Sequence, residues 1–158
     1  MIMNKRNFFK LITLILAVVV NLCFVSCSSS GDGDGQGDIS LDSYIIGSWH
    51  SFKGTVYANG QSQSVNITKT GEYSSAYYEI VFQNGGQAIF KGWLPDNNGL
   101  TKWMEESCRY TIKNDVVTLI DSNGESLGLL FDYGERTLCI RAVINRDTQA
   151  TVNVYLRK

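Results

Sequence analysis

Side chains that commonly carry catalysis are sparse in this chain of 158 residues. His50 is the only histidine, and strand alternation places it on the face opposite to that of Trp49, where we expect it to be solvated. No Gly-x-Ser-x-Gly turn is present to expose a serine nucleophile. Glu105 and Glu106 would supply two carboxylates for glycoside hydrolysis, but adjacent residues of a strand point to opposite faces. These residues therefore argue against an enzyme.

Metal-binding patterns are also missing from the sequence. The acidic run that begins at Asp32 and Asp34 is similar to the start of a calcium-binding loop. Ser43, however, stands at the twelfth position, where such a loop has a bidentate Glu. No group of His and Cys residues has the spacing of metal ligands. We therefore expect neither a metal ion nor another cofactor.

The N-terminal segment has the pattern of an export signal. Three basic residues, Lys5, Arg6 and Lys10, precede an apolar run over residues 11–20. The run is too short for a transmembrane helix, which needs about 20 apolar residues. A basic start followed by a short apolar core is typical of a cleaved signal peptide, so we expect residues 1–26 to take no part in the fold.

Cys27 carries the most specific chemical signal of the sequence. The residues that end at Cys27 resemble a lipobox, with apolar Phe24 three positions before the thiol and small Ser26 directly before it. Cys23 is the competing candidate, but the bulky residue Leu22 precedes it. The resemblance implies cleavage before Cys27 and attachment of a diacylglyceryl group to its thiol. The lipid chains would then anchor the protein to a membrane.

The segment that follows is rich in Ser, Gly and Asp and contains no apolar side chain up to Asp38. We expect residues 27–42 to comprise the lipidated cysteine and a tether, and residues 43–158 to form one folded domain. Acidic residues soon after the cysteine resemble the signals that send Bacteroidetes lipoproteins to the outer face of the outer membrane. This resemblance implies an outer-membrane anchor exposed at the cell surface, with a plain spacer as the alternative.

The charge of the mature chain excludes two classes of partner. Removing residues 1–26 takes away three of the 14 basic residues and none of the 15 acidic ones, which leaves a formal charge of −4. Nucleic-acid binding needs a basic patch, and electrostatic binding to lipid headgroups needs basic clusters. We therefore expect no nucleic acid and no membrane contact beyond the anchor.

Short alternating segments separated by turn residues predict β-structure almost throughout the domain. The residues at 84–86 and 114–115 are typical of hairpin turns. The segment 94–106 contains the only proline and several polar residues, and we predict a long loop there. About eight to nine strands joined by tight turns favour an antiparallel up-and-down β-barrel, with a β-sandwich as the alternative. The expected strands are 45–57, 64–69, 77–82, 88–93, 108–113, 116–121, 127–133, 137–144 and 151–157.

Alternation within the strands gives the expected barrel an inside and an outside. The apolar residues of 127–133 share one face, and so do those of 151–157. Cys108 shares a face with apolar neighbours, whereas Cys139 lies opposite its apolar neighbours. The two thiols are therefore expected on different sides of the sheet, which argues against a disulfide between them.

Gly47-Ser48-Trp49, in the first expected strand, resembles the Gly-x-Trp signature of the lipocalin superfamily. Trp103, followed by a Tyr-x-Ile hairpin, resembles the middle of Bacteroidetes lipocalin-like lipoproteins. The resemblance implies a lipocalin-like barrel in which Gly47 and Trp49 mark one end and Trp49 stacks against a basic residue of the final strand. Arg157 occupies the position expected for that residue. The C-terminal helix and the linked cysteines of lipocalins are not found in the sequence.

Two functions are expected of such a barrel. The first is binding of a small apolar or amphipathic ligand inside the barrel. The alternative is a non-enzymatic surface or structural subunit that docks a protein or a glycan, with the barrel filled by its own side chains. We expect a monomer. The candidate ligand-binding residues are Tyr78, Phe90, Trp93, Trp103, Tyr110 and Phe131.

Overall fold

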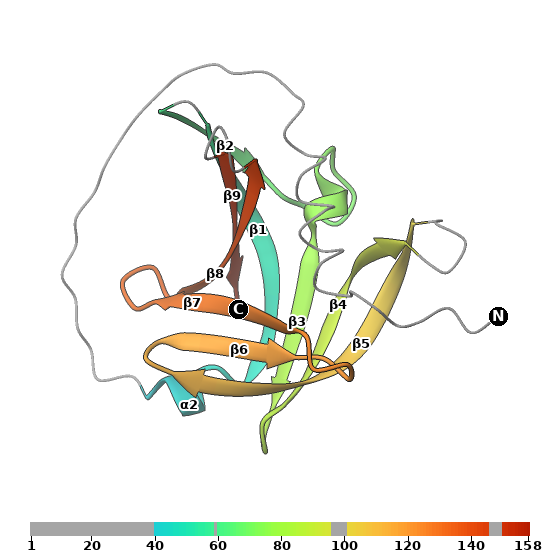
Figure 1. The fold of residues 1–158 in the computed structure, drawn as a ribbon, viewed down its shortest axis with the longest axis vertical. Helices are drawn as coiled ribbons and strands as arrows, with labels where there is room; N and C mark the ends of the chain where they lie inside the picture. Colours follow the sequence, from blue (N-terminus) through green and yellow to red (C-terminus); the bar gives the residue numbers. More distant parts are fainter. Residues whose placement is uncertain (1–39, 59, 96–100, 146–149) are drawn as a thin grey trace.

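Nine antiparallel strands and two short helical segments make up the part of the protein that the computed structural model describes, residues 40–58, 60–95, 101–145 and 150–158 (Figure 1). Within these ranges no helix is long and apolar enough to cross a bilayer. The helical segments are α2 (Leu41–Tyr44) and the 3₁₀ turn η2 (Ser74–Ala76). The strands are β1 (Gly47–Ala58), β2 (Gln61–Asn66), β3 (Tyr78–Gln83), β4 (Gln87–Pro95), β5 (Thr101–Lys113), β6 (Val116–Ile120), β7 (Ser126–Asp132), β8 (Thr137–Asn145) and β9 (Ala150–Arg157).

Hydrogen bonds between β1 and the last strand close the sheet into a barrel. β1 pairs antiparallel with β9, from His50 opposite Arg157 to Tyr57 opposite Thr151. The strand order is β2-β1-β3-β4-β5-β6-β7-β8-β9, so eight strands form the closed wall and β2 is an extra strand on β1. The predicted antiparallel barrel of about eight to nine strands is confirmed. The β-sandwich alternative is wrong, because the β1–β9 pairing joins all the strands into one closed sheet.

β1 changes its neighbour along its length. Residues 47–50 pair with β3, whereas residues 53–58 pair with β2. The change coincides with a bulge between Ser51 and Lys53, and a bulge bends the strand that contains it. In Figure 1, β2 and η2 consequently lie at one end of the molecule and α2 lies at the other.

The β5–β6 hairpin has the turn residues that its geometry needs. Lys113 pairs with Val116, so Asn114 and Asp115 form a two-residue loop. Their φ angles are 49° and 64°. Two positive φ values are required by a type I′ turn, in which Asn and Asp are favoured. The register of this hairpin therefore follows from the sequence, as predicted.

The β4–β5 hairpin corrects the expected loop over residues 94–106. β4 continues to Pro95 and β5 begins at Thr101. Only residues 96–100, which lie outside the described residues, separate the two strands. The prediction was wrong because it took Pro95 and the polar residues after it as the sign of a loop over 94–106, whereas a proline is tolerated where a strand ends.

Cross-strand pairs extend the same hairpin beyond the expected strand ends. Trp93 lies opposite Trp103, and Lys91 lies opposite Glu105. Lys91 Nζ and Glu105 Oε1 form an ion pair at 3.0 Å. Aromatic and oppositely charged pairs of this kind stabilise neighbouring strands.

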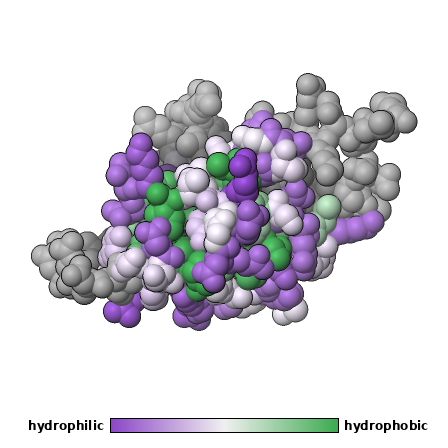
Figure 2. Space-filling model, turned by 90° about the horizontal axis from the view of Figure 1, so that it is seen from below, coloured by the Kyte–Doolittle hydropathy of each residue, from purple (hydrophilic) through white to green (hydrophobic). Residues whose placement is uncertain are grey.

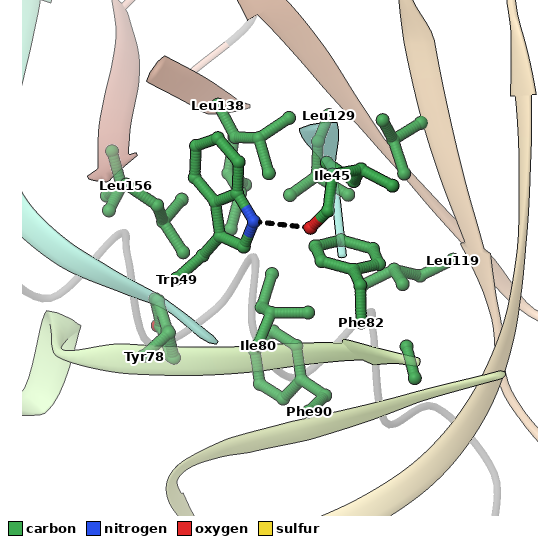
Figure 3. Packing of buried hydrophobic residues seen from close by; sticks show 14 of the residues in the cluster. Ile45, Trp49, Tyr78, Ile80, Phe82, Phe90, Leu119, Leu129, Leu138 and Leu156 are labelled. Atoms are coloured by element: carbon green, nitrogen blue, oxygen red, sulfur yellow. Dashed lines mark hydrogen bonds between the residues drawn. The ribbon is translucent and has the colours of Figure 1, made fainter. Parts of the chain in front are cut away.

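Apolar side chains that alternate with exposed residues along the strands fill the inside of the barrel, as predicted. Leu129 and Phe131 of β7 are buried, whereas Leu130 between them is 55% exposed. Cys108 is buried in the core, and Cys139 is half-buried between two neighbours that point inward. Both thiols are free, and they lie on opposite faces of the wall. The largest fully buried side chains are Trp49, Tyr78, Phe82, Phe90, Ile45, Ile80, Leu119, Leu129 and Leu138 (Figure 3).

The helix α2 closes one end of the barrel. It begins at Leu41, two residues before the expected domain boundary at residue 43, and Leu41 is buried in the core. The fully buried Trp49 donates a hydrogen bond from its indole Nε1–H to the carbonyl oxygen of Ile45, at 2.7 Å (Figure 3). Seen from below, the side on which α2 lies, the described side chains form a continuous surface with small, separate hydrophobic areas (Figure 2).

We predict that Trp49→Ala lowers the free energy of unfolding by about 3–5 kcal/mol, because it removes a large buried ring and its hydrogen bond to Ile45. Urea unfolding followed by circular dichroism measures the change. Trp49→Phe keeps an aromatic ring and removes the indole N–H, so it should cost less. A loss below about 1 kcal/mol for the alanine variant would contradict the role of Trp49 in closing this end.

Candidate functional site

The end of the interior near α2 is filled by aromatic side chains. The Trp49 ring meets the rings of Tyr44 and Phe131 edge to face, with centroid distances of 5.9 and 6.2 Å. Gly47 has a φ of 123°, which residues with a Cβ rarely adopt, so the backbone needs the glycine of the Gly-x-Trp sequence at this position. These contacts give this end a structural role.

The cation beside Trp49 is Lys158 and not Arg157. Lys158 Nζ lies 5.8 Å from the centroid of the Trp49 ring and 4.6 Å from that of Tyr44. The Arg157 guanidinium lies 4.6 Å from the centroid of the Phe52 ring. The expected Trp49–Arg157 stack is therefore wrong. The reason is strand alternation: Leu156 points into the core, so the next residue, Arg157, must point outward.

Tyr78 is a fully buried polar side chain on the inner wall, farther from α2. Ser51 Oγ accepts a hydrogen bond from the Tyr78 backbone N–H at 2.9 Å and donates one to its carbonyl oxygen at 3.3 Å. The Tyr78 ring lies over Gly92, where a Cβ would be 2.7 Å from Tyr78 Cδ1, and its centroid is 5.4 Å from that of Phe90. The hydroxyl has no hydrogen-bond partner among the described residues, and burial raises the pKa of the phenol far above its usual value.

Asp121 adds a buried carboxylate to the inner wall. It continues the inward alternation of β6 and is 4% exposed. Its Oδ1 accepts hydrogen bonds from the backbone N–H groups of Asn123 and Glu125, at 2.8 and 2.9 Å. Its Oδ2 is buried and has no partner within the described part of the chain. The sequence analysis missed this residue, although its spacing from Val117 and Leu119 would have placed it inside.

Glu106 brings a second carboxylate to the same wall. It lies opposite Phe90 in the β4–β5 register, and its Oε1 accepts a hydrogen bond from Ser122 Oγ at 3.4 Å. The buried thiol of Cys108 lies near both acids. Burial first, and then the negative charge of Glu106, raise the pKa of Cys108 to about 11, and Asp121 acts in the same direction. The Cys108 thiol is therefore desolvated, whereas the hydrogen bond between Glu106 and Ser122 is exposed.

Met104 marks the rim of this wall. It lies opposite Gly92 in the register, so its side chain is on the inner face. It is nevertheless 38% exposed, unlike the inner residues near α2. Met104 therefore lies at the edge of the described core.

Four of the six expected ligand-binding aromatics face inward, but at different ends. Tyr78 and Phe90 contact each other on the wall described above. Tyr110 and Phe131 belong to the α2 end, where Tyr110 packs edge to face against Phe82 with centroids 5.0 Å apart. Tyr78 and Phe90 are therefore the two predicted residues that lie beside the buried polar atoms.

Trp93 and Trp103 lie on the outer face, so the expectation that they line the interior is wrong. Their rings meet edge to face with centroids 5.7 Å apart, and Tyr77 stacks on Trp103 at 6.0 Å. Lys69 Nζ lies 4.5 Å from the Trp103 centroid and 3.3 Å from Glu79 Oε1. For Trp103 the error arose because a loop was predicted there, and a loop gives no alternation from which to assign a face. Trp93 ended the expected strand 88–93, and its spacing of three residues from Phe90 already placed the two on opposite faces.

The described residues offer little for catalysis. His50 is half-buried and lies in register between Glu79 and Arg157. Glu105 and Glu106 point to opposite faces of β5, as alternation predicted. No group of three or more His, Cys, Asp or Glu side chains in the described ranges could hold a metal ion. The inner wall carries a few polar atoms set in an apolar surface.

Comparison with known proteins found similarity to solved structures alone, since no protein-family model and no curated protein matches the chain. An uncharacterized protein from Bacteroides eggerthii is 12% identical over 72% of this chain and 98% of its own, with a TM-score of 0.40. The siderocalin Ex-FABP is 12% identical over 72% of each chain, with a TM-score of 0.36. Lobster apocrustacyanin A1 is 12% identical over 72% of this chain and 60% of its own, with a TM-score of 0.35.

We predict that Tyr78→Phe raises the free energy of unfolding of the ligand-free protein by about 1 kcal/mol, because it removes a buried hydroxyl for which no described partner exists. Tyr110→Phe is the matched control. It removes a hydroxyl that donates to the Gln83 carbonyl oxygen at 3.1 Å, so it should lower stability by about 0.5–1 kcal/mol. Urea unfolding at pH 7 compares the two. A clear loss of stability in Tyr78→Phe would mean that the Tyr78 hydroxyl is already paired.

Proposed function

We propose that this protein binds a small apolar or amphipathic molecule inside its barrel, at the end away from α2. The observation that carries the proposal is the Tyr78 hydroxyl, which is buried and has no partner among the described residues. An unpaired buried hydroxyl costs about 1–3 kcal/mol, and a ligand that hydrogen-bonds to it would remove this cost. An eight-stranded barrel is wide enough to hold one small ligand.

The neighbours of Tyr78 support the same location. Phe90 offers an apolar surface beside the Tyr78 ring, which packs over Gly92. Met104 is inward-facing and partly exposed, which gives a ligand a route from this end. The α2 end is filled by Trp49 and its aromatic neighbours, so we place the ligand at the other end. We propose binding, without catalysis, by a monomeric barrel.

The lipid anchor is part of the same proposal. Cys27 and the rest of residues 1–39 lie outside the described residues, and the resemblance of residues 22–27 to a lipobox supports the anchor. α2 begins at Leu41, so the Ser/Gly/Asp-rich residues that follow Cys27 would connect the lipid to the barrel. A chain of this composition and length spans about 20 Å. The barrel would thus be held close to the outer membrane, at the cell surface.

A second function has its own supporting observation. The outer-face aromatic row, which we define as Tyr77, Trp93 and Trp103, is half-exposed and carries Lys69 beside it. Aromatic side chains with polar neighbours are enriched at docking surfaces. A surface subunit that docks a protein or a glycan through this row, with a filled barrel, is therefore the alternative.

Native mass spectrometry of the protein purified in mild detergent from its own host tests the first function. We expect a co-purifying small molecule that is lost on denaturation, and a lower occupancy in Tyr78→Phe. A ligand-free mass that does not change on addition of lipids and hydrophobic metabolites would contradict binding in the barrel. That outcome would favour docking through the outer-face aromatic row.

Cys27→Ala tests the anchor. We expect the variant to lose the lipid and to appear in the soluble fraction or as an uncleaved precursor, because the modified thiol is absent. Cys23→Ala is the matched control and should remain in the membrane fraction. Fractionation, with the intact mass of the processed chain, gives the result. Normal membrane retention of Cys27→Ala would overturn the proposed anchor.

A further inference from the structure

Charged residues are divided unequally around the barrel. Closure joins β2 and β1 to β9 and β8, and these four strands contain no Asp or Glu; we call them the acid-free wall (Figure 1). Their exposed cations are Lys53, Arg141 and Arg157. The acids of the sheet lie on β3, β5 and β7. The formal charge of −4, from which no membrane contact beyond the anchor was expected, therefore averages two unlike sides.

The cations of the acid-free wall lack acidic partners. On the other side of the barrel, Lys69 forms an ion pair with Glu79 at 3.3 Å, and Lys91 forms one with Glu105 at 3.0 Å. Within the described residues, none of the three cations of the acid-free wall makes such an ion pair. Positive charges that share one face without counter-charges create a positive potential, which attracts anions.

Tyr155 of β9 connects two of these cations. Lys53 lies opposite Tyr155 on β1, and its Nζ is 5.5 Å from the centroid of the tyrosine ring. On β8, Arg141 donates a hydrogen bond from Nε to Asn153 Oδ1 at 3.1 Å. Asn153 Nδ2 in turn donates one to the Tyr155 hydroxyl oxygen at 3.3 Å. The two charges thus approach one tyrosine from the strands on both of its sides.

Arg157 and three aromatic rings extend the same face. Arg157 follows Tyr155 by two residues on β9, so both side chains point outward. The Arg157 guanidinium lies 4.6 Å from the centroid of the Phe52 ring, and Tyr57 of β1 is 39% exposed. Tyrosine rings with Lys and Arg beside them are typical of protein surfaces at the headgroup level of a membrane, because each has an apolar body and a polar tip.

The proposed tether joins the barrel beside the acid-free wall. Lys158, the residue after Arg157, places its Nζ 4.6 Å from the centroid of the Tyr44 ring of α2. α2 is the element to which the tether leads. A tether that spans about 20 Å from a lipidated Cys27 would therefore keep this wall within reach of the headgroups. Even a weak attraction would then act at a high effective concentration.

We propose that the acid-free wall lies against the membrane and binds the phosphate groups of its lipids through Lys53, Arg141 and Arg157. The choice of lipid rests on the proposed anchor, whereas the attraction for anions rests on the wall itself. The contact would give the anchored barrel one orientation. The outer-face aromatic row, on β4 and β5, would then face away from the bilayer, because β5 lies opposite β9 in the closed strand order.

Vesicles of two compositions test the proposal: phosphatidylcholine alone, and phosphatidylcholine with about 30% phosphatidylglycerol. The protein is the mature chain from residue 27 with Cys27→Ala, which contains all nine strands and has no lipid of its own. Co-sedimentation measures how much protein binds. We expect binding to the anionic vesicles to be at least about fivefold stronger at low salt, and to disappear at about 0.5 M NaCl because salt screens the charges.

Lys53→Gln combined with Arg157→Gln removes two charges from the wall. We expect this double variant to bind the anionic vesicles about tenfold or more weakly. Arg109→Gln combined with Lys113→Gln is the matched control, because it removes two exposed charges from β5 and should weaken binding less than about twofold. Thermal unfolding checks that both variants fold. If the first does not, Arg141→Gln is the second variant and should weaken binding about fivefold.

Two results would overturn the inference. One is equal binding to both kinds of vesicle, and the other is an equal loss of binding in the wall variant and its matched control. Dextran sulfate, a soluble polyanion, provides a further arm. Binding of dextran sulfate without binding to the anionic vesicles would overturn the assignment to lipid and indicate an acidic glycan. All these outcomes leave the proposed ligand of the barrel interior untouched, since native mass spectrometry tests it separately.

Discussion

The pairing of β1 with β9 is the constraint on which the rest of the structure depends. It turns a meander with two exposed edges into a closed wall, and it leaves β2 as an addition to β1. Once the wall is closed, the alternation of side chains along each strand decides whether a residue faces the core or the outside. The same rule sends Trp49 to the core and Trp93 to the outside. A slip of one residue between β1 and β9 would exchange the two sets, so the inner and outer faces are fixed together.

The two ends of the closed barrel differ in what their side chains bury. Near α2, the hydrogen bond from Trp49 to Ile45 and the surrounding rings give a packed, apolar plug. Farther away, Tyr78 and Asp121 bury polar atoms without described partners. Proteins tolerate such local costs chiefly at functional sites, where another molecule can satisfy the groups.

Local signals in the sequence predicted most of the fold. Asn114 and Asp115 fix a two-residue turn, and alternation then orients the strands on either side of it. The β1–β9 closure is nonlocal, and it was inferred from the strand count rather than from any residue. Errors arose where a local signal was misleading. Pro95 was taken as the sign of a loop, although the β4–β5 pairing continues to this residue. Arg157 was chosen as the cation that stacks on Trp49, although alternation along β9 places Lys158 on the side of Trp49.

The candidate site was harder to predict because its residues look like structural ones. An Asp before a turn is ordinarily explained by the turn, and the Oδ1 of Asp121 does accept two turn N–H groups. These bonds also stop the carboxylate from rotating toward water, and they hold Oδ2 inside the barrel. A fixed, desolvated acceptor loses little entropy when a ligand arrives. Sequence reasoning that stops at the turn therefore misses the other property of Asp121, a buried oxygen without a described partner.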